Sequence, residues 1–277
     1  MHRLRAASLL GFLVVAFYAL PASAHHVASN LGIAYTEPLS YVEVEMLGAK
    51  FDVLGASGEY VEATPTAEYS LNHQFSFSLR APVAWIQRDD GTSTAGLGDM
   101  TVAASAALVR TPHGGLLLSA GLGAELPTGS VERGLGGGHF EADPFLTAST
   151  SPIEHLVFYG RYVDALSLEG HHGGGEEEEE GPGGLHGALI APHTDHELHA
   201  RHGVALAWGS FYADLRNDLV LLWTGPEALG PVRFGADVGW LFGDNLRVRL
   251  GADVPVTASS RAGLRAGLSA AWLFKSF

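Results

Sequence analysis

The sequence has no cysteine, little positive charge and no long apolar run beyond its first residues. Without cysteine it can form no disulfide, no thiolate metal site and no lipid-modified N-terminal cysteine. Its 16 lysines and arginines are outnumbered by 30 aspartates and glutamates, which gives a formal net charge of −14. Such an acidic chain is a poor partner for nucleic acid. The lack of a later apolar segment of roughly 18 residues also excludes a helical membrane protein.

The N-terminal region has the pattern of an export signal. Two arginines precede an apolar run at residues 7–20, and the sequence PASA at 21–24 ends in a cleavage site of the A-x-A kind. The run is shorter than the roughly 20 residues that a helix needs to cross a bilayer. We therefore predict that residues 1–24 are a signal peptide and that residues 25–277 form the exported protein.

Apolar and polar residues alternate over long stretches of the chain. In PVRFGADVGWLF, at 231–242, the apolar side chains fall on one face, and arginine, glycine and aspartate on the other. LRVRLGADV, at 246–254, repeats the pattern after a tight GDN turn. Alternation of this kind indicates a strand, and about 9 to 11 residues let a tilted strand cross a membrane.

The alternative to a membrane barrel is a soluble β-sandwich. Strands in soluble sheets are usually nearer 5 or 6 residues long, and their polar face meets water. In a transmembrane barrel the apolar residues face lipid, and charge and glycine line a wet interior. The long segments, with arginine and aspartate together on one face, favour an all-β, up-and-down transmembrane barrel of antiparallel strands.

We expect about twelve strands, and 10 or 14 are also compatible with the pattern. The predicted strands cover residues 42–53, 59–70, 74–87, 98–109, 115–125, 139–150, 155–166, 200–208, 211–223, 231–242, 245–254 and 263–276. Connections after even-numbered strands are short, and those after most odd-numbered strands are longer or more polar. With both termini in the periplasm, the long loops are extracellular. The first connection, GASG, is short and departs from this rule.

The end of the chain and its tryptophans fit the same location. The terminal Phe277 resembles the C-terminal signal of bacterial outer-membrane barrels, although it is out of phase with the aromatic residues before it. Five aromatic residues fall near predicted strand ends, where interfacial girdles occur: Trp208, Trp223, Trp240, Trp272 and Tyr159. We therefore expect the outer membrane of a Gram-negative bacterium, with its lipid, the barrel-assembly machinery and a small-molecule solute as partners.

Three stretches resemble a known family. GLGDM, at 96–100, opens a predicted strand, and the glycine-rich stretch from 121 to 149, with LPTG inside it, joins two strands. Together with TPTAEYSLNHQFSFSLRAPV, at 64–83, they are similar to outer-membrane proteins of the MetA pathway of phenol degradation. The similarity covers about 61–146 and, more loosely, the C-terminal strands. It implies a barrel that transports hydrophobic aromatic compounds.

Sequence motifs for catalysis are missing. There is no G-x-S-x-G element, and HELH, at 196–199, has a spacing of three where zinc proteases require H-E-x-x-H. GLGGG lies between predicted strands, without the strand-to-helix context of a phosphate loop. We therefore expect no enzymatic activity.

Charged residues recur on the predicted inner faces of the C-terminal strands. They could pair across strands and fill the interior, or form a charged constriction that selects solutes. Twelve strands enclose a bore between that of filled 8-stranded barrels and that of open 16-stranded channels, so we expect a narrow or plugged pore. The predicted pore-lining residues are Asp214, Arg216, Asp218, Arg233, Asp237, Arg247, Arg249, Asp253 and Arg265.

A stretch rich in histidine and glutamate is predicted to be the largest extracellular loop, at about 167–199. Imidazole and carboxylate ligands suit Zn, Cu or Ni, and the run Glu176–Glu180 would concentrate cations. The alternative is a solvated loop of low complexity, because ordering its glycine spacers around an ion costs entropy. The candidate ligands are His171, His172, His186, His193, His196, His199 and His202.

Three functions remain open at this point. The first is a passive channel or transporter for small solutes, including hydrophobic or aromatic ones. The second is a barrel that binds or takes up divalent metal through the histidine-rich loop. The third is a structural or surface barrel without transport.

Overall fold

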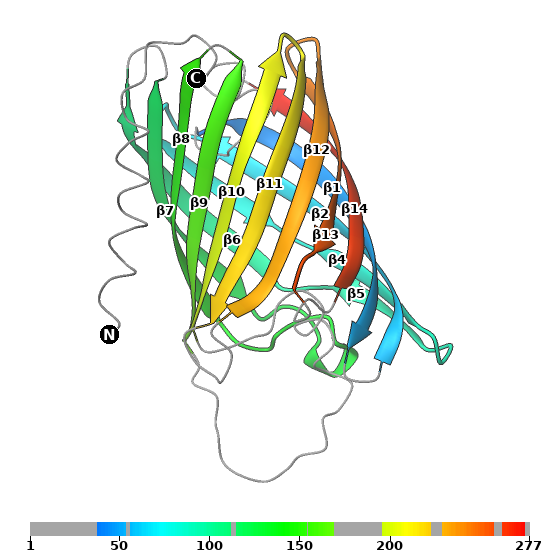
Figure 1. Ribbon diagram of the computed structural model, residues 1–277. Helices are drawn as coiled ribbons and strands as arrows, with labels where there is room; N and C mark the ends of the chain where they lie inside the picture. The colour runs from blue at the N-terminus through cyan, green and yellow to red at the C-terminus, as the bar shows by residue number, and fades with distance from the viewer. Residues whose placement is uncertain are drawn as a thin grey trace, which may run out of the picture.

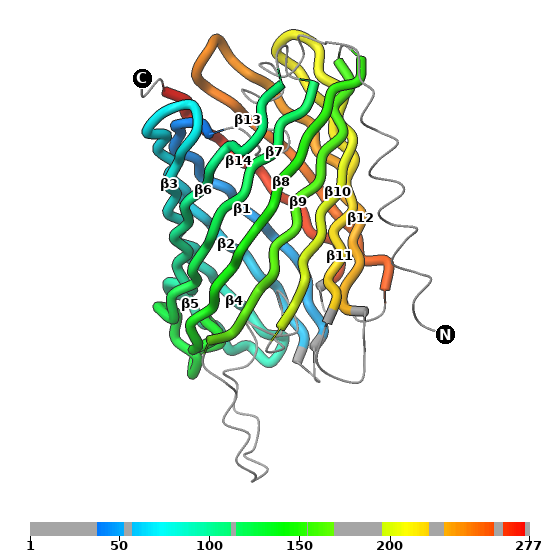
Figure 2. Tube along the Cα trace, turned by 90° about the vertical axis from the view of Figure 1, so that its left-hand side faces the viewer, coloured from blue at the N-terminus to red at the C-terminus, as the bar shows by residue number. Residues whose placement is uncertain are grey.

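Strand segments of the computed structural model close into an antiparallel barrel (Figure 1). The structure describes residues 38–53, 56–111, 115–153, 155–168, 196–222, 229–257 and 262–274. Each strand pairs with its neighbours in sequence, and the first strand, β1, pairs with both β2 and the last strand, β14. Figure 2 shows the strands tilted steeply around the barrel. Closure leaves no open edge in the wall, as a sheet in lipid requires.

Ten segments each form a complete barrel strand. They are β1 (Ser40–Val53), β2 (Ala56–Ser70), β7 (Leu116–Leu126), β8 (Glu141–Ile153), β9 (Leu156–Ser167), β10 (His196–Trp208), β11 (Phe211–Leu222), β12 (Leu229–Phe242), β13 (Leu246–Pro255) and β14 (Ala262–Phe274).

Two further barrel strands are interrupted. β3 (Phe75–Arg80) and β4 (Val83–Arg88) pair with successive halves of β2, and β5 (Ser93–Leu97) continues into β6 (Met100–Arg110). The first break falls at Pro82, which has no N–H to donate to a ladder. Its carbonyl accepts a hydrogen bond from Gly98 N at 2.8 Å, so the two breaks face each other. With these pairs counted as one strand each, the barrel has the predicted 12 strands.

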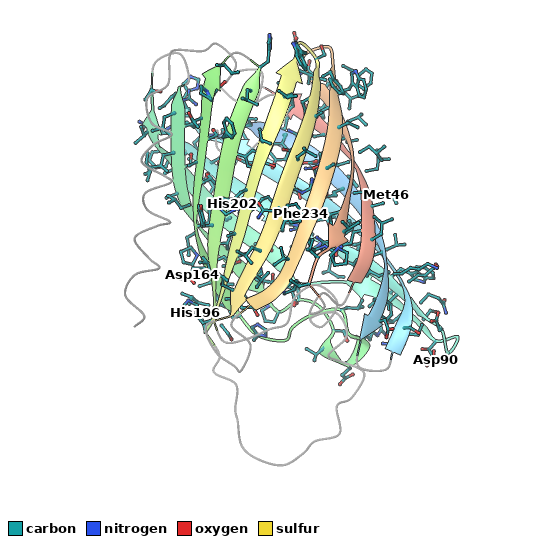
Figure 3. All side chains as sticks on the ribbon, in the orientation of Figure 1. Met46, Asp90, Asp164, His196, His202 and Phe234 are labelled. Atoms are coloured by element: carbon teal, nitrogen blue, oxygen red, sulfur yellow. The ribbon has the colours of Figure 1, made fainter. Side chains whose placement is uncertain are left out.

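The outer surface of the barrel is apolar along the length of the strands. Phe77, Leu215, Phe234 and Leu250 are each more than half exposed, and the residues beside them in sequence point inward. Figure 3 shows Phe234 and Met46 on the outside of the wall. This apolar exterior on long strands is what the hydrocarbon core of an outer membrane requires.

Short turns join the strands at the end of the barrel where β14 finishes (Figure 1). Between β10 and β11 the turn is Gly209-Ser210, and Gly209 has φ +53°, a left-handed conformation that glycine adopts without strain. Trp208, Trp240 and Trp272, each about half exposed, lie on the outer face at this end, as predicted for an aromatic girdle. Tyr159 does not belong to the girdle, because its hydroxyl donates to Asp214 on the inner face.

The connection between β7 and β8 contains the short 3-10 helix η2 (Val131–Arg133). No helix within the described residues is long and apolar enough to cross a membrane. The strand boundaries otherwise agree with the predicted ones to within a few residues, apart from two starts. The strand made of β5 and β6 begins at Ser93, five positions before the predicted start. β10 begins at His196, four positions before the predicted start, so the last residues assigned to the histidine-rich loop are part of the wall.

Candidate functional site: the charged lumen

A network of ion pairs covers the inner face from β10 to β14. Arg201 on β10 pairs with Asp218 on β11, and Arg216 on β11 pairs with Asp237 on β12. Arg216 also lies 3.7 Å from Asp218 and 3.9 Å from Asp253, so that it links three strands. Alternation places all these residues on the face opposite the lipid-facing ones. The cross-strand pairing predicted from sequence is therefore present.

Asp253 on β13 is the centre of this network. Its Oδ1 accepts hydrogen bonds from Nε of Arg233 on β12 and from Nε of Arg265 on β14, the latter at 2.9 Å. Arg233 also donates to the carbonyl of Gly263 at 2.6 Å. Asp253 and Arg233 are each 6% exposed, so little water screens the pair. One carboxylate thus binds two guanidinium groups on flanking strands.

A second group of pairs spans the closing seam of the barrel. Arg247 on β13 donates to Glu43 on β1 at 3.0 Å, and Arg249 donates to Glu45 at 2.9 Å. Both contacts reach across β14, where the registers place Ala271 between Arg247 and Glu43. Small inward residues on β14 leave room for the long side chains on either side.

Glycine on the inner face makes room for this network. A Cβ added at Gly251 would overlap the carboxylate of Asp237. A Cβ at Gly235 would lie 3.0 Å from Cζ of Arg216. The glycines that alternate with apolar residues in the sequence therefore leave space on the inner face for charged side chains.

Replacing Gly251 with alanine is expected to push Asp237 away from Arg216 and to lower the free energy of unfolding by about 1–3 kcal/mol. Urea unfolding in phospholipid vesicles measures the difference. Gly48→Ala is the control, because a Cβ there would approach only the carbonyl of Tyr60, at 3.9 Å. Equal losses for the two variants would show that Gly251 is not needed for side-chain space.

The wall formed by β7, β8 and β10 is acidic near the extracellular end. Glu125 and Glu141 are opposite each other in register, and Asp143 follows on the same inner face. Glu141 lies 3.5 Å from Nε2 of His139, and Glu197 on β10 lies 3.0 Å from Nε2 of His199. Four carboxyl groups and two imidazoles thus gather on this part of the inner wall.

The β7–β8 connection folds across the extracellular opening and is fixed by Asp99. This carboxylate, 7% exposed, lies in the break between β5 and β6. Its Oδ1 accepts a hydrogen bond from Gly129 N at 2.8 Å, and its Oδ2 accepts one from Gly137 N at 2.6 Å. Thr128 Oγ1 donates to the carbonyl of Gly98 at 2.9 Å and accepts from Met100 N at 3.0 Å. Side chain and backbone thus hold both ends of the connection.

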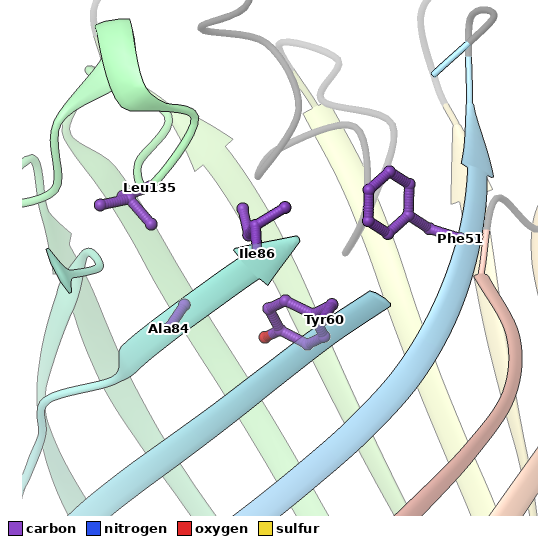
Figure 4. Close-up of a cluster of buried hydrophobic side chains, with 5 residues drawn as sticks. All are labelled: Phe51, Tyr60, Ala84, Ile86 and Leu135. Atoms are coloured by element: carbon purple, nitrogen blue, oxygen red, sulfur yellow. The ribbon is translucent and has the colours of Figure 1, made fainter. Parts of the chain in front are cut away.

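Leu135, from the middle of the connection, packs against the inner face of the strands that follow β7 around the barrel. It is 1% exposed and forms a cluster with Phe51, Tyr60, Ala84 and Ile86 (Figure 4). These partners come from the inner faces of β1, β2 and β4. Burying a leucine side chain contributes roughly 1.5–3 kcal/mol, which helps to keep the connection inside the mouth.

The histidines predicted as metal ligands fall into two groups. His171, His172, His186 and His193 lie outside the described residues, and their metal binding stays a prediction. His196, His199 and His202 lie on β10. Within the described residues no group of three or more potential ligands could hold a metal ion.

The three strand histidines do not point to a common centre. His196 and His202 share the outer face of β10, where they contact Asp164 and Tyr162 of β9, each at 2.6 Å (Figure 3). His199 is on the inner face with Glu197. The three-residue spacing suggested one ligand cluster, but the strand's two-residue period sends adjacent members to opposite faces.

Comparison with known proteins supports both the fold and the resemblance. Residues 40–162 match the family described as "Putative MetA-pathway of phenol degradation". The family resemblance expected from the sequence is confirmed. No curated protein matches the sequence.

Solved structures share the barrel at low sequence identity. An outer membrane channel from Pseudomonas putida F1 has a TM-score of 0.64 and 13% identity, covering 85% of this chain and 96% of that chain. The NanC porin has a TM-score of 0.55 and 10% identity, covering 84% and 99%. The KdgM porin has a TM-score of 0.52 and 9% identity, covering 85% and 99%. At these identities the likeness shows the fold.

The segments that carried the family resemblance meet in the structure. GLGDM contributes Asp99, and LPTG contributes Thr128 and Gly129, which form the hydrogen bonds described above. The family match thus includes the connection that folds into the mouth.

All nine predicted pore-lining residues lie on the inner face, and each takes part in an ion pair or a hydrogen bond. Their contact with a solute stays a prediction. Sequence reasoning missed the acidic partners on β1, the acidic wall and the role of Asp99. Alternation within β1 could have placed Glu43 and Glu45 inside, because valine and methionine occupy the intervening positions.

Proposed function

We propose that this protein is a passive, narrow outer-membrane channel for small solutes and that it catalyses no reaction. The observation that carries the proposal is the charged, paired lumen, which a structural barrel would not need. Buried charges cost free energy unless they are paired, and inside a membrane protein they commonly mark a solute pathway. The β7–β8 connection occupies part of the mouth and so narrows the opening.

Solutes that suit this lumen are small and have a polar group. Charged and hydroxyl side chains line most of the inner wall, and apolar contacts gather at the Leu135 cluster near the mouth. The family's description refers to phenol degradation. A phenol-sized aromatic ring with a hydroxyl group combines both chemistries, and it is the solute class we propose.

The charge of the wall should make the channel prefer cations. The network from β10 to β14 pairs its arginines with carboxylates, whereas Glu125, Asp143 and Glu141 face the lumen with a histidine neighbour. Arg161 lies on the same wall over the Phe145 ring, 4.7 Å from its centroid, deeper than these carboxylates. Rings of carboxylates select cations in other channels.

Planar bilayers containing the purified barrel test this proposal. We expect small, steady conductance steps and, across a KCl gradient, a reversal potential with the sign of cation preference. Glu125→Gln combined with Asp143→Asn should shift that potential toward zero. An absence of conductance from a folded barrel, shown by its heat-modifiable gel migration, would overturn the channel proposal.

Asp90→Asn provides the matched control for charge. Asp90 lies in the exposed turn between β4 and β5, away from the acidic wall (Figure 3). Hydrogen bonds from the Thr92 side chain and backbone hold its pKa below the usual range, so the control removes a full negative charge at neutral pH. An equal shift in reversal potential from Asp90→Asn would mean that general surface charge, and not the wall, sets selectivity.

Liposome swelling with phenol and with larger aromatic alcohols tests the solute class. We expect swelling rates to fall steeply as the solute grows beyond a single ring, because the connection narrows the mouth. Equal rates for one-ring and multi-ring solutes would contradict a narrow pore.

A further inference from the structure

We propose that Asp99 is a latch that sets the pore size by holding the β7–β8 connection, residues 127–140, across the mouth. This inference rests on the proposed channel function and adds to it a residue that determines which solutes pass. Asp99 contacts no solute in this proposal. It acts by positioning the connection.

The geometry around Asp99 is that of a fixed anchor. Its two carboxylate oxygens bind the backbone N–H groups of Gly129 and Gly137, on either side of η2. Charged acceptors form stronger hydrogen bonds than neutral ones, and these are shielded because Asp99 is 7% exposed. A loop of this length would otherwise be able to leave the lumen at little cost.

Close packing around Asp99 leaves no space for side chains at several glycines of the connection and its neighbours. A Cβ at Gly136 would lie 2.6 and 2.8 Å from the two oxygens of Asp99, and one at Gly129 would lie 2.8 Å from Gly136 Cα. A Cβ at Gly96 would lie 2.8 Å from Cδ1 of Leu135. The backbone therefore approaches the carboxylate at distances that only glycine permits.

The position of Leu135 shows what the latch controls. The connection starts between β7 and β8, yet Leu135 reaches inward-facing residues of β1, β2 and β4 (Figure 4). The segment therefore reaches inward over the part of the opening that β5, β4, β2 and β1 border. If the latch is released, the hydrogen bonds of Thr128 still hold the start of the connection, and the apolar contacts of Leu135 oppose movement of the rest into the external medium.

Asp99→Ala is expected to raise single-channel conductance by roughly twofold or more and to let larger solutes pass in liposome swelling. The variant should retain the heat-modifiable migration of the folded barrel, because the Asp99 carboxylate accepts its hydrogen bonds from the connection. Unchanged conductance in a folded Asp99→Ala barrel would overturn the latch.

A switchable variant tests the same idea within one protein. Asp99→Cys with Gly137→Cys replaces the carboxylate contact by a disulfide, because a Cβ at Gly137 would lie 3.7 Å from Oδ2 of Asp99 and would closely approach only the ring of His139. The natural chain has no cysteine, so no other thiol interferes. We expect wild-type conductance from the oxidised form and, after reduction, the conductance of Asp99→Ala. Each single-cysteine variant is a control that should not respond to reductant.

The outcomes separate the latch from the channel proposal. A conductance that rises reversibly on reduction supports the latch. The same conductance before and after reduction, with disulfide formation verified by mass, overturns it while leaving the channel intact. Absence of conductance in the wild type and in every form would overturn the channel proposal itself.

Discussion

Asp253→Ala is expected to lower the free energy of unfolding by about 3–5 kcal/mol, because it leaves buried arginines without their counter-charge. Arg233 and Arg265 share Oδ1 of Asp253, so removal of this carboxylate leaves two neighbouring guanidinium groups to repel each other. Asp253→Asn should lose nearly as much, since it keeps the shape and removes the charge.

Urea unfolding in phospholipid vesicles, followed by tryptophan fluorescence, provides the measurement. Glu45→Ala is the control, because Glu45 is 40% exposed and its pair with Arg249 is open to solvent screening. We expect a loss below about 1 kcal/mol for that control. Similar losses for Asp253→Ala and Glu45→Ala would contradict a central role for Asp253.

Leu250→Arg is expected to destabilise the barrel by about 2–4 kcal/mol, because it puts a cation on the lipid-facing side of β13 near mid-strand. Leu250 is 57% exposed and is opposite Val238 and Leu268 in register, so apolar neighbours surround it on both sides. Lipid tails there cannot solvate a guanidinium group.

Val256→Arg is the control for this prediction. Val256 is 59% exposed, as Leu250 is, but it follows the last residue of β13 at the extracellular rim. Near the interface the same change should cost about 0–1 kcal/mol. Folding yields in vesicles of matched lipid thickness report the difference. If both arginine variants unfold at the same urea concentration, Leu250 does not face hydrocarbon.

The barrel could be predicted from sequence because its two faces meet different solvents. Lipid on one side and a wet lumen on the other impose a two-residue period, which is clear in β12 and β13. The start of β10 was missed because this two-residue alternation is absent there. Near the rim neither face is apolar, so His196 and Glu197 show no alternation although they lie in a strand.

The contacts inside the lumen were beyond sequence reasoning, because they depend on register. Alternation puts Arg247 on the inner face, but only the alignment of β13, β14 and β1 shows that Glu43 is its partner. Asp99 was visible in the GLGDM motif without a role. Its hydrogen-bond partners are 30 and 38 residues away in the sequence. No local sequence pattern predicts that the β7–β8 connection folds toward Asp99.

The pairs across the closing seam affect how the barrel assembles. Arg247 and Glu43 are separated by 204 residues, so their contact forms only after nearly all strands have joined the barrel. Until then each strand edge carries a charge that a bilayer solvates poorly. The last step of assembly therefore removes both an unpaired edge and two sets of isolated charges, which makes closure steeply favourable and reopening slow.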